Sequence, residues 1–226
     1  MLAKFNPTPP VMNKLTALLG IVASFAGLAD VHAQVPSTTS AKEELVNIKK
    51  VNVSVQKTPK IQADGPTDKR WTPKDWLEIE VDCDILKSKK SKDPKQNSHE
   101  SVTFKYFVYL EGQSKEKSRI LTGEVTHGNV PIEKDQHSVM YLTPSTIFDL
   151  TGKKEGNPSA VKFWGVVATV GGETVGYKVS PGAPGSADKP WWEAPTAPAK
   201  EAALKKKSQT PFSILWADFH LDESSK

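Results

Sequence analysis

A strict alternation of apolar and acidic residues constrains the fold more than any other feature of this sequence. Between Leu77 and Ile85 every odd-numbered residue is apolar and every even-numbered residue is acidic. Successive side chains of a β-strand point to opposite faces, so this stretch predicts a strand with one buried and one solvated face. Cys83 belongs to the apolar set. We expect it to be a small core residue, because reactive thiols need positively charged surroundings.

Short runs of this kind recur along the chain and are separated by turn residues. Gly171 and Gly172 predict a tight hairpin between two of them, and Thr143–Asp149 predicts a single helical turn. Regularly spaced short strands with one-sided alternation predict an all-β fold, a sandwich or barrel with antiparallel sheets. The predicted strands are Leu45–Val55, Trp76–Ile85, Val102–Leu110, Arg119–Val125, Ser138–Leu142, Val161–Val170, Thr174–Val179 and Phe212–Phe219.

The last quarter of the chain has a different composition. Residues 180–211 contain six prolines and predict an extended connector that covers the strands. Within it, Ala197–Ser208 is the only helix candidate, because Ala, Glu, Lys and Leu favour helices. Phe212–Phe219 is predicted to be a closing strand. We therefore expect one domain over residues 45–226, which contains the connector and follows a flexible lead-in at residues 34–44.

The first 33 residues predict a signal peptide. Lys4 and Lys14 precede an uncharged apolar run, Leu15–Leu28, and Val31-His32-Ala33 has the small-x-small pattern of a cleavage site. The run has 14 residues, whereas a membrane span needs about 20. We therefore expect an exported protein, located in the periplasm, on the outer membrane surface or outside the cell, with no membrane span in the mature chain.

The sequence contains no catalytic or metal-binding signature. Nucleophile elbows, Walker loops and zinc-protease motifs are missing, and the single Cys excludes an internal disulfide and an all-Cys metal site. A net charge of +4 argues against a dedicated nucleic-acid binder. We expect no enzymatic activity, cofactor or metal. The alternative is a hydrolase that uses two of the acidic strand residues as its catalytic carboxylates. The residues expected to be solvated are His99, His127, His137 and His220, and the acidic strand residues Glu78, Glu80, Asp82 and Asp84.

Tryptophans and lysines supply the candidate contact residues. Trp191, Trp192 and Trp216 are candidates for stacking on sugar rings or for a protein interface. For Trp191 and Trp192 the alternative is that they anchor the connector to the strands. A basic run also offers contacts with anionic surfaces, unless it only keeps a loop soluble. Its candidate residues are Lys87, Lys89, Lys90 and Lys92.

The leader, the strand number, the Pro190-Trp-Trp-Glu193 connector and the late Phe212–Ala217 stretch together resemble a known group of proteins. They are verrucomicrobial exported proteins encoded beside type IV pilus-like assembly genes in mucin-associated gut bacteria. The resemblance implies an immunoglobulin-like antiparallel β-sandwich of seven to eight strands, related to archaeal type IV pilus subunits. The Cys…Trp…Cys spacing of antibody domains and the leader of bacterial pilins are both missing.

These observations predict a non-enzymatic, exported immunoglobulin-like module for pilus-like assembly or for contact with a host surface. The expected partners are pilus-related or envelope proteins, host glycans or host proteins, and a second copy bound through edge strands, but not nucleic acid. Phe212–Phe219 is the expected edge strand. The alternative is a carbohydrate-binding module that uses Trp191, Trp192 or Trp216.

Overall fold

Nine strands in two sheets form the framework of the computed structural model, which describes residues 43–60 and 71–224. The described residues all belong to one compact unit. The predicted signal peptide (1–33), most of the lead-in and the turn at Asp64-Gly-Pro66 lie outside the described residues.

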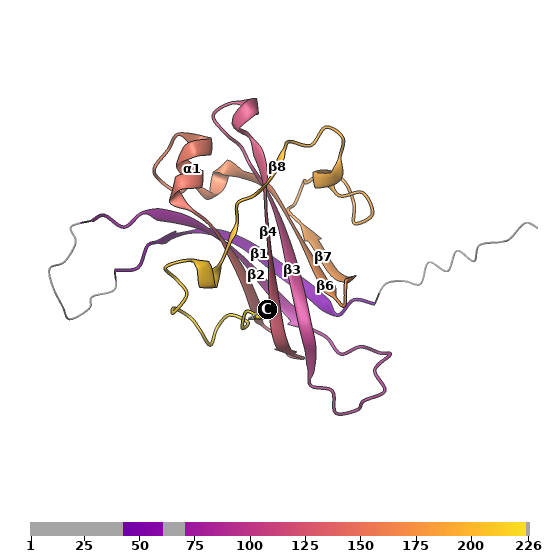
Figure 1. Ribbon diagram of the computed structural model, residues 1–226. Coiled ribbons are helices and arrows are strands. Elements are labelled where there is room, and N and C mark those ends of the chain that lie inside the picture. Colours follow the sequence, from indigo (N-terminus) through magenta and orange to yellow (C-terminus); the bar gives the residue numbers. More distant parts are fainter. Residues whose placement is uncertain (1–42, 61–70, 225–226) are drawn as a thin grey trace, which may run out of the picture. The chain divides into compact units, whose positions relative to one another are not determined.

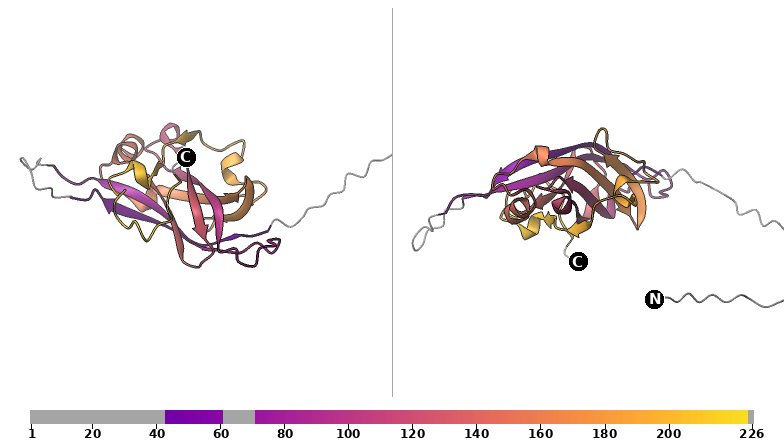
Figure 2. Two further views of the ribbon diagram at one scale, coloured as in Figure 1. Left: turned by 60° about the horizontal axis from the view of Figure 1, so that its bottom comes forward. Right: turned by 90° about the horizontal axis from the view of Figure 1, so that it is seen from above.

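The two sheets have the strand order of a Greek-key sandwich. The first, second and fifth strands form one sheet, and the third, fourth, sixth and seventh form the other, as in immunoglobulin-like domains. This confirms the predicted all-β sandwich. The first sheet contains β1 (Val46–Lys57), β2 (Asp75–Ile85), β5 (Gln136–Leu142) and β9 (Lys205–Lys206). The second contains β7 (Glu173–Val179), β6 (Val161–Val170), β3 (Ser98–Leu110), β4 (Arg119–Pro131) and β8 (Lys200–Ala202). The views in Figure 2 show the sheets from two further sides.

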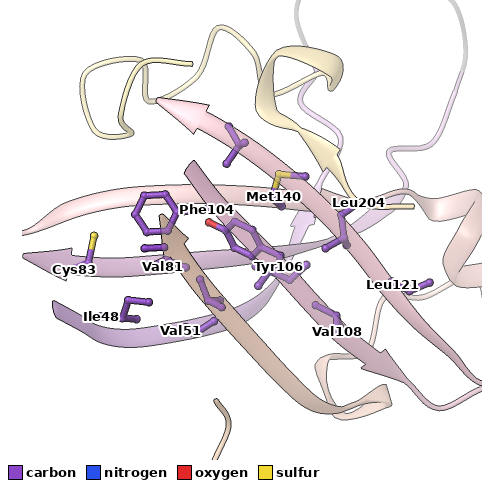
Figure 3. Close-up of a cluster of buried hydrophobic side chains, with 14 of the residues drawn as sticks. Ile48, Val51, Val81, Cys83, Phe104, Tyr106, Val108, Leu121, Met140 and Leu204 are labelled. Carbon is purple, nitrogen blue, oxygen red and sulfur yellow. The ribbon is translucent and has the colours of Figure 1, made fainter. Parts of the chain in front are cut away.

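The core lies between the sheets and is built from the apolar residues of each alternating strand. Val81 and Cys83 of β2 face Phe104 and Tyr106 of β3, and all four are fully buried. Figure 3 shows these side chains pointing into one space, together with Met140 of β5. Burial, and then the neighbouring Asp82 and Asp84 carboxylates, raise the pKa of the Cys83 thiol to about 12. The prediction that Cys83 is a core residue is confirmed.

The predicted hairpin turn and helical turn are both present. The Gly171–Gly172 turn joins β6 to β7, and both glycines have positive φ, as a type I′ hairpin requires. The predicted helical turn is a helix, α1 (Pro144–Thr151). The Thr143 side chain accepts a hydrogen bond from the backbone N–H of Thr146 at its start, and Gly152 ends it in the left-handed region.

The helix candidate Ala197–Ser208 does not form an α-helix. Lys200–Ala202 instead pairs in parallel with β4 as β8, and Lys205–Lys206 pairs with β5 as β9. The connector therefore adds one short strand to an edge of each sheet and links the two sheets there. Between the two strands Leu204 enters the core, where a Cβ on Gly123 would lie 2.6 Å from the Leu204 Cβ. Sheet hydrogen bonds and this close approach outweigh helix propensity.

The predicted closing strand at Phe212–Phe219 is also wrong. Residues 211–222, called here the C-terminal segment, form successive turns, with hydrogen bonds from Leu215 N–H to Phe212 O and from Phe219 N–H to Trp216 O. Trp216 has a φ of 53°, which a strand residue does not adopt. The expected pairing through an edge strand at this position is thus not available.

The connector and the C-terminal segment cover the outer faces of different sheets. Trp191 and Trp192 of the connector pack on Phe107 and neighbouring residues of the β7–β6–β3–β4–β8 sheet. Phe212 of the C-terminal segment packs on Val139 and other residues of the β1–β2–β5–β9 sheet. Figure 1 shows the two segments in gold and yellow beside the strands. Both sheets therefore bury apolar residues on both faces.

Candidate functional site

The C-terminal segment forms a pocket against the outer face of the β1–β2–β5–β9 sheet. Its volume is about 330 Å³. Two carboxylates of β2 and the aromatic side chains of the C-terminal segment face each other across it. We call it the aromatic–acidic pocket; its lining residues are Gln56, Glu78, Glu80, Trp216, Phe219 and His220.

Glu78 is the buried carboxylate of this pocket. Only 5% of its surface is exposed, although it belongs to the face of β2 that the alternation predicts to be solvated. Its Oε2 accepts a hydrogen bond from the Tyr141 hydroxyl at 2.8 Å, and its Oε1 accepts hydrogen bonds from Ser54 Oγ at 3.2 Å and Gln56 Nε2 at 3.1 Å. Three neutral donors from β1 and β5 therefore hold the carboxylate in one position.

Glu80 lies two residues along β2 and points to the same face. Its Oε1 is 2.9 Å from Nδ1 of His137, but the imidazole is not aligned for a hydrogen bond. Burial raises the pKa of the Glu80 carboxyl, and His137 opposes this while Glu78 adds to it. The pocket thus brings two carboxylates together in a partly dehydrated environment.

Trp216 and Phe219 form the aromatic wall of the pocket. They are 43% and 51% exposed, so their rings remain available for contact. Phe219 stacks on the His137 imidazole with ring centres 4.0 Å apart. The Lys207 ammonium donates a hydrogen bond to the Trp216 carbonyl at 2.9 Å and so supports the left-handed turn. A strained residue held by such contacts is typical of binding sites.

This arrangement suits recognition. Exposed aromatic faces beside a few fixed polar groups are the usual components of small-ligand and glycan sites. The described residues contain no group of three or more His, Cys, Asp or Glu side chains that could hold a metal ion. The part of the chain that the structure describes also contains no helix that is long and apolar enough to cross a membrane.

A Ser–His pair lies elsewhere, between the sheets. His127 Nε2 is 2.8 Å from Ser138 Oγ, and the Tyr106 hydroxyl donates to the same oxygen at 2.8 Å. Such a pair resembles an activated nucleophile. However, Ser138 is fully buried, so its hydroxyl has no contact with solvent. The three side chains therefore join β3, β4 and β5 as a buried polar network.

Trp191 and Trp192 are buried, which agrees with the prediction that they anchor the connector and not with a role as free contact surfaces. They are 7% and 3% exposed. Trp192 stacks on Phe107 with ring centres 4.2 Å apart and an interplanar angle of 4°, and Trp191 meets it edge to face. Gly165 allows this approach, because a Cβ there would lie 2.1 Å from Trp192 Cζ3. The pair anchors the connector, and Trp216 is the one candidate tryptophan with an open surface.

A groove borders this anchor, between the connector and the β7–β6–β3–β4–β8 sheet. Its volume is about 760 Å³, and Tyr109, Phe163 and Trp191 supply aromatic lining. Its lining also includes Asp188 and Glu193, and the Glu193 carboxylate is paired with the Lys200 ammonium at 2.6 Å.

The candidate lysines lie in the loop between β2 and β3. Lys87, Lys89, Lys90 and Lys92 are all exposed. The Lys87 ammonium donates to the Pro94 carbonyl at 2.9 Å and thereby shapes the loop. The structure does not bring these residues near the aromatic–acidic pocket lining, and their contact with anionic surfaces stays a prediction.

The expectation of solvated histidines and a solvated acidic face is wrong in part. His99, His127 and His220 are buried, and so is Glu78. Lys49 lies 3.2 Å from a carboxylate oxygen of Asp82 and of Asp84. Alternation alone does not reveal that a later segment covers a strand face. The aromatic run at Phe212–Phe219 was the available signal for such a cover.

A protein-family model matches residues 37–226, which is most of the chain. The chain belongs to this family. A crystal structure of a protein from Akkermansia muciniphila is similar, with 24% sequence identity and a TM-score of 0.70; the similarity covers 80% of this chain and 93% of that one. At this identity the similarity shows the fold alone. None of the curated proteins matches this chain.

These findings confirm part of the resemblance drawn from the sequence. The family match and the similar fold of a protein from a verrucomicrobium agree with it. The link to a pilus-like gene cluster stays a prediction.

The buried His220 predicts acid sensitivity. Burial, and then the nearby Lys207 ammonium, lower the pKa of His220 from 6.5 to about 4. Between these pH values the imidazole binds a proton in the unfolded chain but not in the folded chain. The contribution of His220 to the unfolding free energy is therefore fully present above pH 6.5 and is lost as the pH drops towards 4. The expected loss from this group is about 3 kcal/mol. The measurement is the free energy of urea unfolding across this range.

The His220→Gln variant isolates this contribution. As the pH drops from 6.5 towards 4, the unfolding free energy of the wild type should fall more steeply than that of the variant. The two slopes should differ by up to about 1.4 kcal/mol per pH unit. Comparing the variant with the wild type cancels the contribution of His127, whose pKa burial also lowers. Equal slopes for the two proteins would contradict the assignment to His220.

Proposed function

We propose that this protein is an exported, non-enzymatic immunoglobulin-like module that binds a partner in the envelope or at the cell surface, as part of a type IV pilus-like assembly. The observation that supports partner binding is the exposure of Ile214, Trp216 and Phe219, which are 67%, 43% and 51% exposed within six residues of one segment. Clustered exposed apolar side chains mark contact sites in soluble domains.

The rigid support of this segment favours the same proposal. Phe212 is buried at its base and stacks on Tyr141 with ring centres 4.7 Å apart. The backbone N–H of Leu221 donates to the His137 carbonyl, and that of Ser224 donates to the Thr126 carbonyl. The segment is therefore held at both ends, so partner binding does not have to order a flexible loop. The sequence of the leader supports export, and the family resemblance supports the pilus-like setting.

A triple variant tests this function. Ile214→Ser, Trp216→Ser and Phe219→Ser together remove the exposed apolar surface and leave Phe212 in place. We expect recovery of cross-linked envelope partners from intact cells to fall by about tenfold or more, as for an interface hot spot. The measurement is quantitative mass spectrometry of cross-linked complexes, with sedimentation of the purified protein to detect self-association.

The matched control is Phe148→Ser. Phe148 is 50% exposed on α1, far from this segment in sequence, and its removal changes exposed apolar area without touching the C-terminal segment. It should leave partner recovery at the wild-type level. Equal recovery by the triple variant and the control would refute the role of the C-terminal segment.

Carbohydrate binding is a second candidate, favoured by one observation. The exposed Trp216 ring borders a pocket whose other walls include Gln56 and Glu80, and sugar sites combine an aromatic face with such polar groups. A glycan array with tryptophan-quench titration tests it. The absence of any saturable response at low and at physiological salt would exclude this use of Trp216.

A further inference from the structure

We infer that the aromatic–acidic pocket binds an organic cation, namely a primary or quaternary ammonium group, between the aromatic faces of Trp216 and Phe219 and the carboxylates of Glu78 and Glu80. This inference rests on the proposed function and deepens it, since it names the chemical group that a partner or ligand would present to the C-terminal segment.

The first support is a buried carboxylate that lacks a cationic partner. The donors to Glu78 are the hydroxyl groups of Tyr141 and Ser54 and the amide of Gln56, which carry no charge. Within the described residues no ion pair involves Glu78. A buried carboxylate that only neutral donors contact has lost water without gaining a countercharge, and a cation in the adjacent space would supply that countercharge.

The second support is the position of Glu80 beside this charge. It follows Glu78 by two residues on the same face of β2, and both line the pocket. The neighbouring charged groups are Asp82 on β2, His137 on β5, and Lys207 before the C-terminal segment. The Lys207 ammonium donates to the Trp216 carbonyl at 2.9 Å, and its charge also acts on Glu78. Lys207 does not line the pocket, and its single positive charge does not balance the two carboxylates that do.

The third support is the aromatic wall itself. Trp216 and Phe219 both line the pocket with part of their surface exposed. The faces of aromatic rings attract ammonium groups, and sites for quaternary ammonium ligands are built from such rings. The volume of about 330 Å³ lies within the range of small-ligand pockets. The site therefore has room for an ammonium group and its attached carbons.

The fourth support is an unsatisfied nitrogen. His220 lines the pocket and is 8% exposed, and its Nδ1 has no hydrogen-bond partner among the described residues. A neutral imidazole nitrogen accepts a hydrogen bond from a primary ammonium group. Trp216 and Phe219 both meet the His220 ring edge to face, so the imidazole is held beside the aromatic wall.

Isothermal titration of the purified protein with choline and with its neutral isostere 3,3-dimethylbutan-1-ol tests the inference. Choline is expected to bind about tenfold or more tightly than the isostere, because the two differ mainly in charge. Glu80→Gln and Phe219→Leu should each weaken choline binding severalfold or more. Phe148→Ser should leave it unchanged. Equal affinities for choline and the isostere, or no binding of choline, would overturn the inference.

Two further probes separate the sources of the cation. Nα-acetyl-lysine methylamide represents a protein side chain, and glucosamine represents an amino sugar, with neutral N-acetylglucosamine as its control. Stronger binding of N-acetylglucosamine than of every cationic probe would overturn the inference in favour of carbohydrate recognition.

The outcomes also distinguish this inference from the proposed function. Choline binding by a protein whose triple variant still captures its envelope partners supports the cation site and refutes partner binding through the segment. If the triple variant loses those partners and the wild type binds no cation, partner binding through the segment is supported and the cation site is refuted.

Discussion

Trp192→Ala is expected to destabilise the protein by about 3–5 kcal/mol, the range for deleting a large buried aromatic side chain. Trp192 is almost fully buried, stacks on Phe107 and meets Trp191 edge to face. Its loss leaves a cavity beneath the connector and exposes the outer face of the β7–β6–β3–β4–β8 sheet. The measurement is the free energy of urea unfolding, followed by circular dichroism.

Trp71→Ala is the control of the same residue type. Trp71 is 47% exposed, and its removal should cost less than about 1 kcal/mol. Gly165→Ala gives a second, independent check, because the added Cβ would lie 2.1 Å from Trp192 Cζ3. The Gly165 substitution should be destabilising in the wild type and nearly neutral in Trp192→Ala, which removes the clash. Additive effects would show that the connector is not seated as described.

Phe212→Ala is expected to cost a similar amount, about 3–5 kcal/mol, and to disrupt the aromatic–acidic pocket as well. Phe212 stacks on Tyr141 and meets Trp76 edge to face with ring centres 5.7 Å apart. It is the buried anchor of the C-terminal segment. Without it the segment should become accessible, so we expect faster cleavage by chymotrypsin in the segment together with the lower unfolding free energy.

Ile214→Ala is the matched control within the same segment. Ile214 is highly exposed, so its truncation should change the free energy of unfolding by less than about 0.5 kcal/mol and leave the cleavage rate unchanged. If Phe212→Ala behaved like Ile214→Ala in both measurements, the C-terminal segment could not be docked through Phe212.

The alternating strands were predictable because their signal is local. The residues of β2 and β3 alternate with period two, and the inward set on each strand is buried as expected. The hairpin glycines and the cap of α1 also depend on neighbours within a few residues. In such segments the backbone geometry and the burial preference of each residue point to the same structure.

The candidate site was predictable only in part. The sequence pointed to Trp216, but Glu78 and His220 were expected to be solvated, and Phe219 was assigned to a strand. Glu78 is buried because Tyr141 and Ser54 on neighbouring strands hold it and because the C-terminal segment covers it. None of these partners is a neighbour of Glu78 in the sequence, so no local pattern around it contains this information.

The sequence by itself determined strands β1 to β7, their inward faces and the core position of Cys83, since period-two alternation and tight turns are properties of consecutive residues. The tertiary structure alone decided the course of the chain after β7. Residues 200–202 and 205–206 are extended because β4 and β5 offer them hydrogen-bonding edges. The C-terminal segment instead turns, with Phe212 packed on Tyr141 and Trp216 in the left-handed region. The pocket exists only where that segment meets the acidic face of β2, a contact between residues far apart in the chain.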